Sequence, residues 1–236
     1  MKPHESWKVL PHGELERLAD NLYTVVGKLK MPGGETPRRM TIVPLADGRL
    51  AIYSAIALDE PHMAQLEALG KPAFLIVPSG IHRLDAHPWK ERYPDLRVIA
   101  PAGARGKIKE VVHIDSTKPH ATPFNDPRVE LTYIPGTAQR ELAMTVETST
   151  GKTLVVNDLI FNLPKMGGIA GLGLRLLGFH PGEPSMPKLV KRRLVENDKA
   201  VKDQLRVWAA AGFERILPAH GDAIETPRET LLKLAA

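Results

Sequence analysis

Histidine and aspartate side chains that follow predicted strands are the residues of this chain best placed to do chemistry. His82 and Asp85 lie in the loop after one strand, and Asp158 and His220 lie at the ends of two later strands. Functional side chains often gather in such loops, because the strands hold them in fixed positions. Two imidazoles and two carboxylates could hold one metal ion, and His87 is near enough in sequence to act as a substitute ligand.

Nitrogen and oxygen ligands of this kind suit Zn²⁺, Mn²⁺ or Fe²⁺. If one coordination position stays open, a bound water becomes a nucleophile near neutral pH, which is hydrolase chemistry. If all four side chains close the coordination sphere, the ion is structural and no water is activated. Without a metal, the same side chains could form a hydrogen-bonded network that anchors the loops. The residues leave these three alternatives open.

Three short segments resemble, in their order along the chain, motifs of the metallo-β-lactamase superfamily. The segment PSGIHRLDAHPWKERYP, residues 78–94, resembles the superfamily's first motif, HxHxDH, and the helix after it. The segment VVNDLIF, residues 155–161, is similar to the strand end that supplies the bridging aspartate. The segment LPAHG, residues 217–221, is similar to the one with the terminal histidine. The resemblance implies that Asp158 and His220 are metal ligands.

The first motif departs from the superfamily pattern in either alignment. If His82 matches the second histidine, then Gly80, Leu84 and Asp85 stand at the first histidine, the aspartate and the last histidine. If His82 matches the first histidine, His87 is kept as the last one, but apolar residues fill the middle pair. Two ligand types are lost in both cases.

The middle histidine of the superfamily is also replaced, because Thr137 takes its place in the segment PGTA, residues 135–138. A normal dinuclear zinc site is therefore not expected, and the resemblance implies at most one Zn, Mn or Fe ion. The altered first motif and the residues RYP at 92–94 are similar to an uncharacterised bacterial branch of the superfamily. No reaction follows from that likeness.

Apolar runs between turn residues predict the elements that must position these side chains. Helices are expected between Asp59 and Gly70, around 89–93 and over 197–211. Strands are expected at 40–45, 50–53, 74–77, 97–100, 111–114, 129–134, 142–148, 153–156 and 215–217. Two β-rich halves, each closed by helices, predict two facing sheets with helices outside. Together with the resemblance, this implies an α/β fold, a four-layer αββα sandwich of the metallo-β-lactamase type. At 236 residues we expect one domain spanning 1–236.

The segment 164–187 is rich in glycine and proline and contains no confidently predicted element. A long loop of this kind is often a lid or a binding loop, and it can equally be a surface excursion without a role. Selectivity in this fold lies in such loops, so the sequence does not identify a substrate.

Composition narrows the classes of protein that the chain could represent. There is no cysteine, which excludes disulfides, thiolate zinc sites and cysteine nucleophiles. The net charge of +5 is spread along the chain, and its densest group, at 188–193, is typical of a solvated helix face. Ser79 lacks the GxSxG frame of a serine hydrolase. We therefore expect no nucleic-acid partner, and a small-molecule substrate is the partner to consider.

No membrane or secretory segment is predicted. Residues 1–8 are charged, without the apolar run of a secretory signal, and the apolar stretch 166–179 is too short and too rich in glycine to span a bilayer. A cytoplasmic location is the expectation.

Other polar side chains have simpler interpretations. His4, His12 and His62 are expected at the surface, and His113 is expected in the core or on a sheet face. Asp222 follows His220 closely and could orient its imidazole as a hydrogen-bond partner, although exposure to solvent is the simpler expectation.

Two functional hypotheses follow. The first is a hydrolase-like protein in which His82, Asp85, Asp158 and His220 bind one ion, whose water attacks an ester, lactone, thioester or phosphoester. The second is a non-catalytic binding or scaffold protein that keeps the sandwich and has lost the metal. The two hypotheses differ in metal content.

Overall fold

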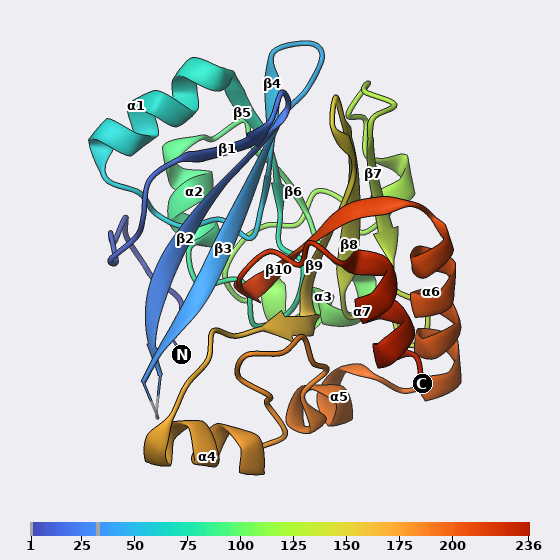
Figure 1. Cartoon of the computed structure of the whole chain (residues 1–236). Helices are drawn as coiled ribbons and strands as arrows, with labels where there is room; N and C mark the ends of the chain where they lie inside the picture. Colours follow the sequence, from blue (N-terminus) through green and yellow to red (C-terminus); the bar gives the residue numbers. More distant parts are fainter. Residues whose placement is uncertain (1, 32–33) are drawn as a thin grey trace.

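The first half of the chain forms a β-sheet whose strands follow their order in the sequence (Figure 1). The structure is a computed structural model that describes residues 2–31 and 34–236. Neighbours from β1 to β4 are antiparallel, whereas β4, β5 and β6 run parallel. The predicted hairpin around Asp47 and Gly48 joins β3 to β4. The strands are β1 (Glu16–Ala19), β2 (Leu22–Met31), β3 (Gly34–Pro44), β4 (Arg49–Tyr53), β5 (Lys71–Ile76) and β6 (Arg97–Ile99).

The second half forms another sheet, with the strand order β10-β9-β8-β7. Here β7, β8 and β9 are antiparallel neighbours, and β10 lies parallel to β9. The strands are β7 (Val129–Tyr133), β8 (Leu142–Thr148), β9 (Gly151–Asn162) and β10 (Phe213–Gly221). The functional segments at Asp158 and His220 therefore lie on neighbouring strands.

Helices cover the outer face of the first sheet. Met63 and Leu66 of α1 (Glu60–Leu69) and Trp89 of α2 (Ala86–Arg92) are fully buried against it, and α3 (Arg105–Ile108) adds Ile108. Asp59 begins α1, as predicted, because its carboxylate accepts a hydrogen bond from the backbone N–H of His62.

The two sheets face each other across a second apolar core. Along β4, Leu50 and Ile52 pack toward α1 and α2, whereas Ala51 and Tyr53 pack toward the second sheet. The run at 74–77 divides in the same way, which confirms a strand buried on both faces.

The outer face of the second sheet is covered by the helices at the end of the chain. Val201, Leu205 and Trp208 of α6 pack there with Leu231 of α7. These helices are α6 (Asp198–Ala210) and α7 (Pro227–Leu234). The layers therefore run helix, sheet, sheet, helix, and the predicted αββα sandwich is confirmed.

Three local predictions were wrong or incomplete. Residues 111–114 form a turn and irregular backbone rather than a strand, because the Asp115 carboxylate and the backbone of Ser116 pair with the edge of β6 instead. The segment 164–187 contains α4 (Gly168–Leu176), and α5 (Lys188–Leu194) follows it. Helix α7 was not predicted, although Pro227 at its first turn is a typical start signal. Within residues 2–31 and 34–236, no helix is long and apolar enough to cross a membrane.

Candidate metal centre

His82, Asp158 and His220 come together although they are far apart in the sequence. The Nε2 atoms of His82 and His220 are 3.0 Å apart. Asp158 Oδ1 lies 3.2 Å from His82 Nε2 and 3.4 Å from His220 Nε2. All three side chains are almost fully buried, with 4%, 5% and 11% of the side-chain surface of His82, Asp158 and His220 exposed. Of the four predicted ligands, the structure unites these three.

His220 is held at the end of β10 by its backbone and by its ring. Its Nδ1–H donates to the carbonyl of Pro37 at 2.8 Å, so the lone pair of a neutral ring is on Nε2 and faces His82. The ring also stacks on Phe161, with centroids 4.7 Å apart. The buried guanidinium of Arg39 donates to the carbonyls of Pro218 and Gly221, which fixes the backbone on both sides of His220.

His82 is oriented by a serine from the first sheet. Ser54 follows β4, and its Oγ is 2.8 Å from His82 Nδ1. Ser54 has a φ of 57°, a left-handed conformation that is uncommon outside glycine and is frequent at functional sites. Burial lowers the pKa of His82, and Asp158 offsets this only in part. The ring is therefore neutral near pH 7, and its Nε2 can act as a ligand.

A bulge in β9 aims Asp158 into the cluster. The pairing of β10 with β9 jumps from Pro218 with Val156 to His220 with Phe161, so extra residues of β9 arch out of the ladder. The backbone N–H groups of 157, 158 and 159 all donate to the buried carboxylate of Glu141. The Glu141 side chain thus accepts the hydrogen bonds that these three N–H groups do not donate to the neighbouring strand.

The carboxylate of Asp158 has partners on both oxygens. Ser79 Oγ donates to Oδ2 at 2.9 Å, and Asn157 Nδ2 donates to the same oxygen at 2.7 Å. Burial alone raises the pKa of Asp158, but the imidazoles of His82 and His220 outweigh it and hold that pKa well below its ordinary value. Oδ1 therefore stays an ionised acceptor that faces the two Nε2 atoms.

Three atoms that can each donate an electron pair converge here, and either a shared proton or a cation between them would satisfy all three. Ligand atoms at about 2.1 Å from a tetrahedral zinc ion are about 3.4 Å apart. The observed separations of 3.0 to 3.4 Å are close to that value. Each imidazole also has a partner for its outer nitrogen, which is typical of metal-ligating histidines. The donor set fits one divalent ion.

Asp85, the fourth predicted ligand, is not in this group. Its buried carboxylate pairs with Arg38 of β3 and with His4, whose Nδ1 is 2.8 Å away. The hydrogen-bonded guanidinium of Arg38 supplies the positive charge that a metal ion would otherwise supply to this carboxylate. His4, expected at the surface, is instead largely buried beside it.

The remaining sequence candidates lie away from the cluster. His87 is half-exposed and pairs with Glu91 one helical turn later. Asp222 is exposed, and its backbone N–H donates to Asn162. His113, expected in the core or on a sheet face, is exposed, because residues 111–114 do not form the predicted strand. Thr137, at the position of the middle histidine, is buried and its hydroxyl donates to Ile134.

Sequence reasoning missed the residues that position the ligands. Ser54 and Glu141 belong to no motif, and a polar residue directly after or before an apolar run was the available signal. Ser79 lies in the first motif but gave no sign of its bond to Asp158. Arg38 and Arg39 form a basic pair directly before the largely apolar second half of β3, residues 40–44. Buried arginines in a strand require acceptors, which points to a polar site nearby.

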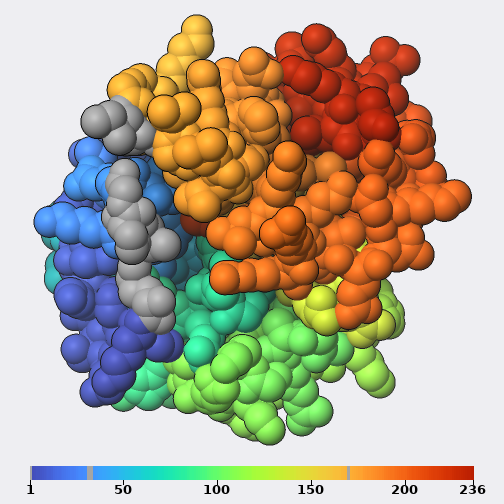
Figure 2. Space-filling view, turned by 90° about the horizontal axis from the view of Figure 1, so that it is seen from below, coloured from blue at the N-terminus to red at the C-terminus, as the bar shows by residue number. Residues whose placement is uncertain are grey.

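The segment between α4 and α5 contributes to the surroundings of the site. Phe161 exchanges backbone hydrogen bonds with Ser185, and its ring contacts that of Phe179. Figure 2 views the molecule from below, where the gold part of the chain, which includes α4, lies near the blue first part of the chain, and the orange part lies next to the teal part. Segments far apart in the sequence thus meet on one face.

Comparison with known proteins identifies the fold. No family model and no curated protein sequence matches the chain. Among solved structures, the DIM-1 metallo-β-lactamase exposed to ceftazidime matches with a TM-score of 0.65 and 13% identity, over 97% of this chain and 98% of that one. The mono-zinc form of the FIM-1 metallo-β-lactamase from Pseudomonas aeruginosa matches with a TM-score of 0.62 and 14% identity, over 97% and 96%.

A metallo-β-lactamase from Erythrobacter litoralis is similar at a TM-score of 0.63 and 14% identity, over 94% of this chain and 95% of that one. The similarity therefore extends over nearly the whole length of these chains, and this protein has the metallo-β-lactamase fold. At these identities the likeness concerns the fold, so any function must be argued from the residues of the site.

Proposed function

We propose that this protein is a hydrolase-like member of the metallo-β-lactamase fold in which His82, Asp158 and His220 hold one divalent metal ion. The observation that carries the proposal is the convergence of their three acceptor atoms within 3.4 Å in a buried setting. Zn²⁺, Mn²⁺ and Fe²⁺ all accept this nitrogen and oxygen set. When bound with an open position, such an ion activates water for attack on an ester, lactone, thioester or phosphoester of a small-molecule substrate.

The protein's own residues would orient the ligand side chains, and Asp158 would supply a fixed negative charge. Ser54 and the Pro37 carbonyl keep both Nε2 atoms turned inward, and Glu141 keeps the β9 bulge that presents Asp158. Three protein ligands are the number that catalytic zinc sites use, whereas structural sites close with four. The pairing of Asp85 with Arg38 supports the three-ligand set.

The alternative is a binding or scaffold protein without a metal. It is favoured by the hydrogen bonds that already satisfy Asp158 Oδ2 and by Gly80 and Leu84, which stand where the first motif has ligands. In that case a shared proton among the three side chains would replace the ion.

Metal stoichiometry separates the two functions. Protein purified without an affinity tag or chelator is analysed for metals, beside His220→Ala and the control His113→Ala, which removes an exposed histidine outside the cluster. We expect His220→Ala to lose about one ion per chain relative to the wild type and His113→Ala to lose none. Equal metal content in folded wild type and His220→Ala would refute the proposal.

A further inference from the structure

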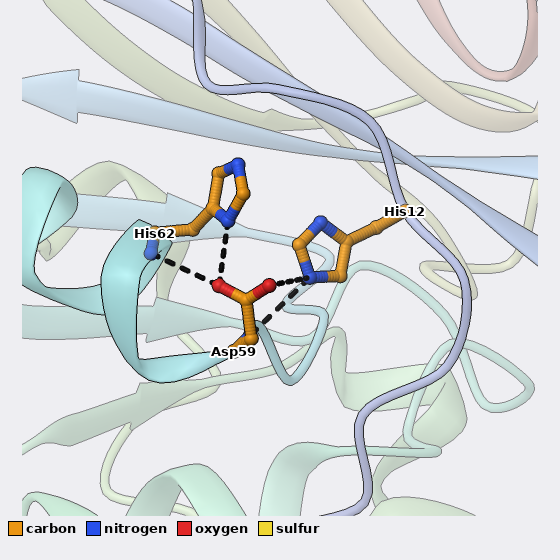
Figure 3. Close-up of side chains that lie close together, drawn as sticks. All are labelled: His12, Asp59 and His62. Atoms are coloured by element: carbon orange, nitrogen blue, oxygen red, sulfur yellow. Dashed lines mark hydrogen bonds and ion pairs between the residues drawn. The ribbon is translucent and has the colours of Figure 1, made fainter.

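A second group of potential ligands lies on the outer side of the first sheet, apart from the candidate centre. His12, Asp59 and His62 place one ligand atom each within 4.8 Å of one another. Figure 3 shows the two imidazoles on either side of the Asp59 carboxylate. The group shares no residue with the cluster at β9 and β10, and the proposed function does not use it.

Each member of the group is fixed by local backbone structure. His12 precedes β1 and forms an isolated bridge with Gly27 of β2, which holds the N-terminal segment against the sheet. Asp59 is the N-cap of α1, and His62 lies in the first turn of that helix. Two distant segments therefore meet through these three side chains.

The outer nitrogen of each ring is already occupied by an acceptor. His12 Nδ1 lies 2.9 Å from the carbonyl of Gly13, so Nδ1 carries the hydrogen and the Nε2 lone pair faces Asp59. His62 Nε2 lies 3.0 Å from a carboxylate oxygen of Glu14, and its Nδ1 faces Asp59 at 2.6 Å. Such acceptors on the far nitrogen are typical of histidines that bind metals.

The nitrogen and oxygen atoms that face one another within the group are close enough for small side-chain rotations to bring them around one ion. Asp59 Oδ2 lies 3.9 Å from His12 Nε2, and the ring centroids are 4.9 Å apart. A bound ion would replace the hydrogen between His62 and Asp59 and draw His12 closer. The side chain of His12 is 4% exposed and that of Asp59 is 47% exposed, so the group can be reached from solvent through the carboxylate.

We propose that His12, Asp59 and His62 form a second divalent metal site, of the Zn²⁺ class. The ion would tie the N-terminal segment to the start of α1 and close the outer layer over the first sheet. Two imidazoles and one carboxylate suit Zn²⁺, and Glu14 acts through His62 rather than as a ligand.

Two features of the group predict that it binds a metal ion more weakly than the candidate centre does. The backbone N–H of Asp59 donates to His12 Nε2 at 3.2 Å, and an ion must displace that hydrogen bond. The positive end of the α1 dipole also lies near the group and opposes a cation. Binding should therefore need more free metal than the candidate centre does.

The test is a calorimetric titration of the full chain with Zn²⁺. The chain carries His220→Ala, which removes one ligand of the candidate centre. We expect one remaining equivalent, a rise in melting temperature of about 5 °C at saturating Zn²⁺, and loss of both with His12→Gln. Asp59→Asn is a second variant, because asparagine still caps the helix while the anionic ligand is removed.

The control is His113→Ala in the same background, and each protein is checked for folding by circular dichroism. If the His220→Ala protein binds no Zn²⁺, or if folded His12→Gln and Asp59→Asn bind as His113→Ala does, the second site is refuted. Neither result depends on metal at the candidate centre, so the two proposals can fail separately.

Discussion

The ion pair between Arg38 and Asp85 gives the sharpest prediction, because it decides whether Asp85 supports the fold or binds a metal. Both side chains are buried, with 7% and 1% of their surfaces exposed. Arg38→Met leaves the Asp85 carboxylate buried with only His4 as a partner. Removing one member of a buried pair costs about 3–5 kcal/mol, because the other charge stays desolvated.

The free energy of unfolding of Arg38→Met should therefore fall by about 4 kcal/mol, which corresponds to a drop of about 10 °C in melting temperature for a chain of this size. The double variant Arg38→Met with Asp85→Leu removes both charges and should recover most of that loss. Guanidinium unfolding of the wild type, both single variants and the double variant measures the coupling energy directly.

The control is Lys199→Met, which breaks an exposed pair with Asp203 and should cost no more than about 1 kcal/mol. A cost for Arg38→Met as small as that of the control would refute the buried ion pair. Metal analysis of Asp85→Asn completes the test. Unchanged metal content supports the structural role, and the loss of one ion would restore Asp85 as the ligand that the sequence predicted.

Three further predictions concern the groups around the two sites. Glu141→Ala should destabilise the protein by at least about 3 kcal/mol in urea unfolding, because three buried N–H groups lose their acceptor. Ser54→Ala should lower metal affinity about tenfold in a chelator competition without unfolding the chain, because His82 loses its orienting partner. Hydrogen bonds to Asp59 and Glu14 raise the pKa of His62, so its stabilising contribution is complete below about pH 6.5 and is lost as pH rises through the raised value. In metal-free protein, His62→Ala should shift the urea midpoint more at pH 5.5 than at pH 9, and equal shifts would contradict this.

The fold was predictable because its layers leave periodic signals. The apolar run at 74–77 and the hairpin at Asp47 and Gly48 each define an element without reference to the rest of the chain. Two of the candidate ligands, Asp158 and His220, were predictable for a related reason, since each follows a strand that the pattern identifies.

The remaining features depend on contacts between distant segments, which a local pattern does not contain. Asp85 and His82 look equivalent in the sequence, but Arg38, 47 positions earlier than Asp85, decides that only His82 joins the cluster. The burial of His12 was unpredictable for the same reason. Its side chain was expected at the surface, but it is buried beside Asp59 and His62, which lie far away in the sequence. The prediction of a strand at 111–114 was wrong because the carboxylate of Asp115 pairs with the edge of β6, where that strand would have lain.

Charge balance supports the proposal that the candidate centre holds one ion rather than two. Asp85 is neutralised by Arg38, whose positive charge also opposes protonation of His82. Burial and the charge of Asp158 raise the pKa of Glu141 well above its ordinary value, and the three backbone amides that oppose this shift are the hydrogen-bond partners of its carboxyl group. Asp158 is then the carboxylate of the described site that still lacks a cation. In the proposed one-ion site, a single divalent ion beside the two imidazoles would supply that cation, whereas a second ion would have to displace Arg38 from Asp85.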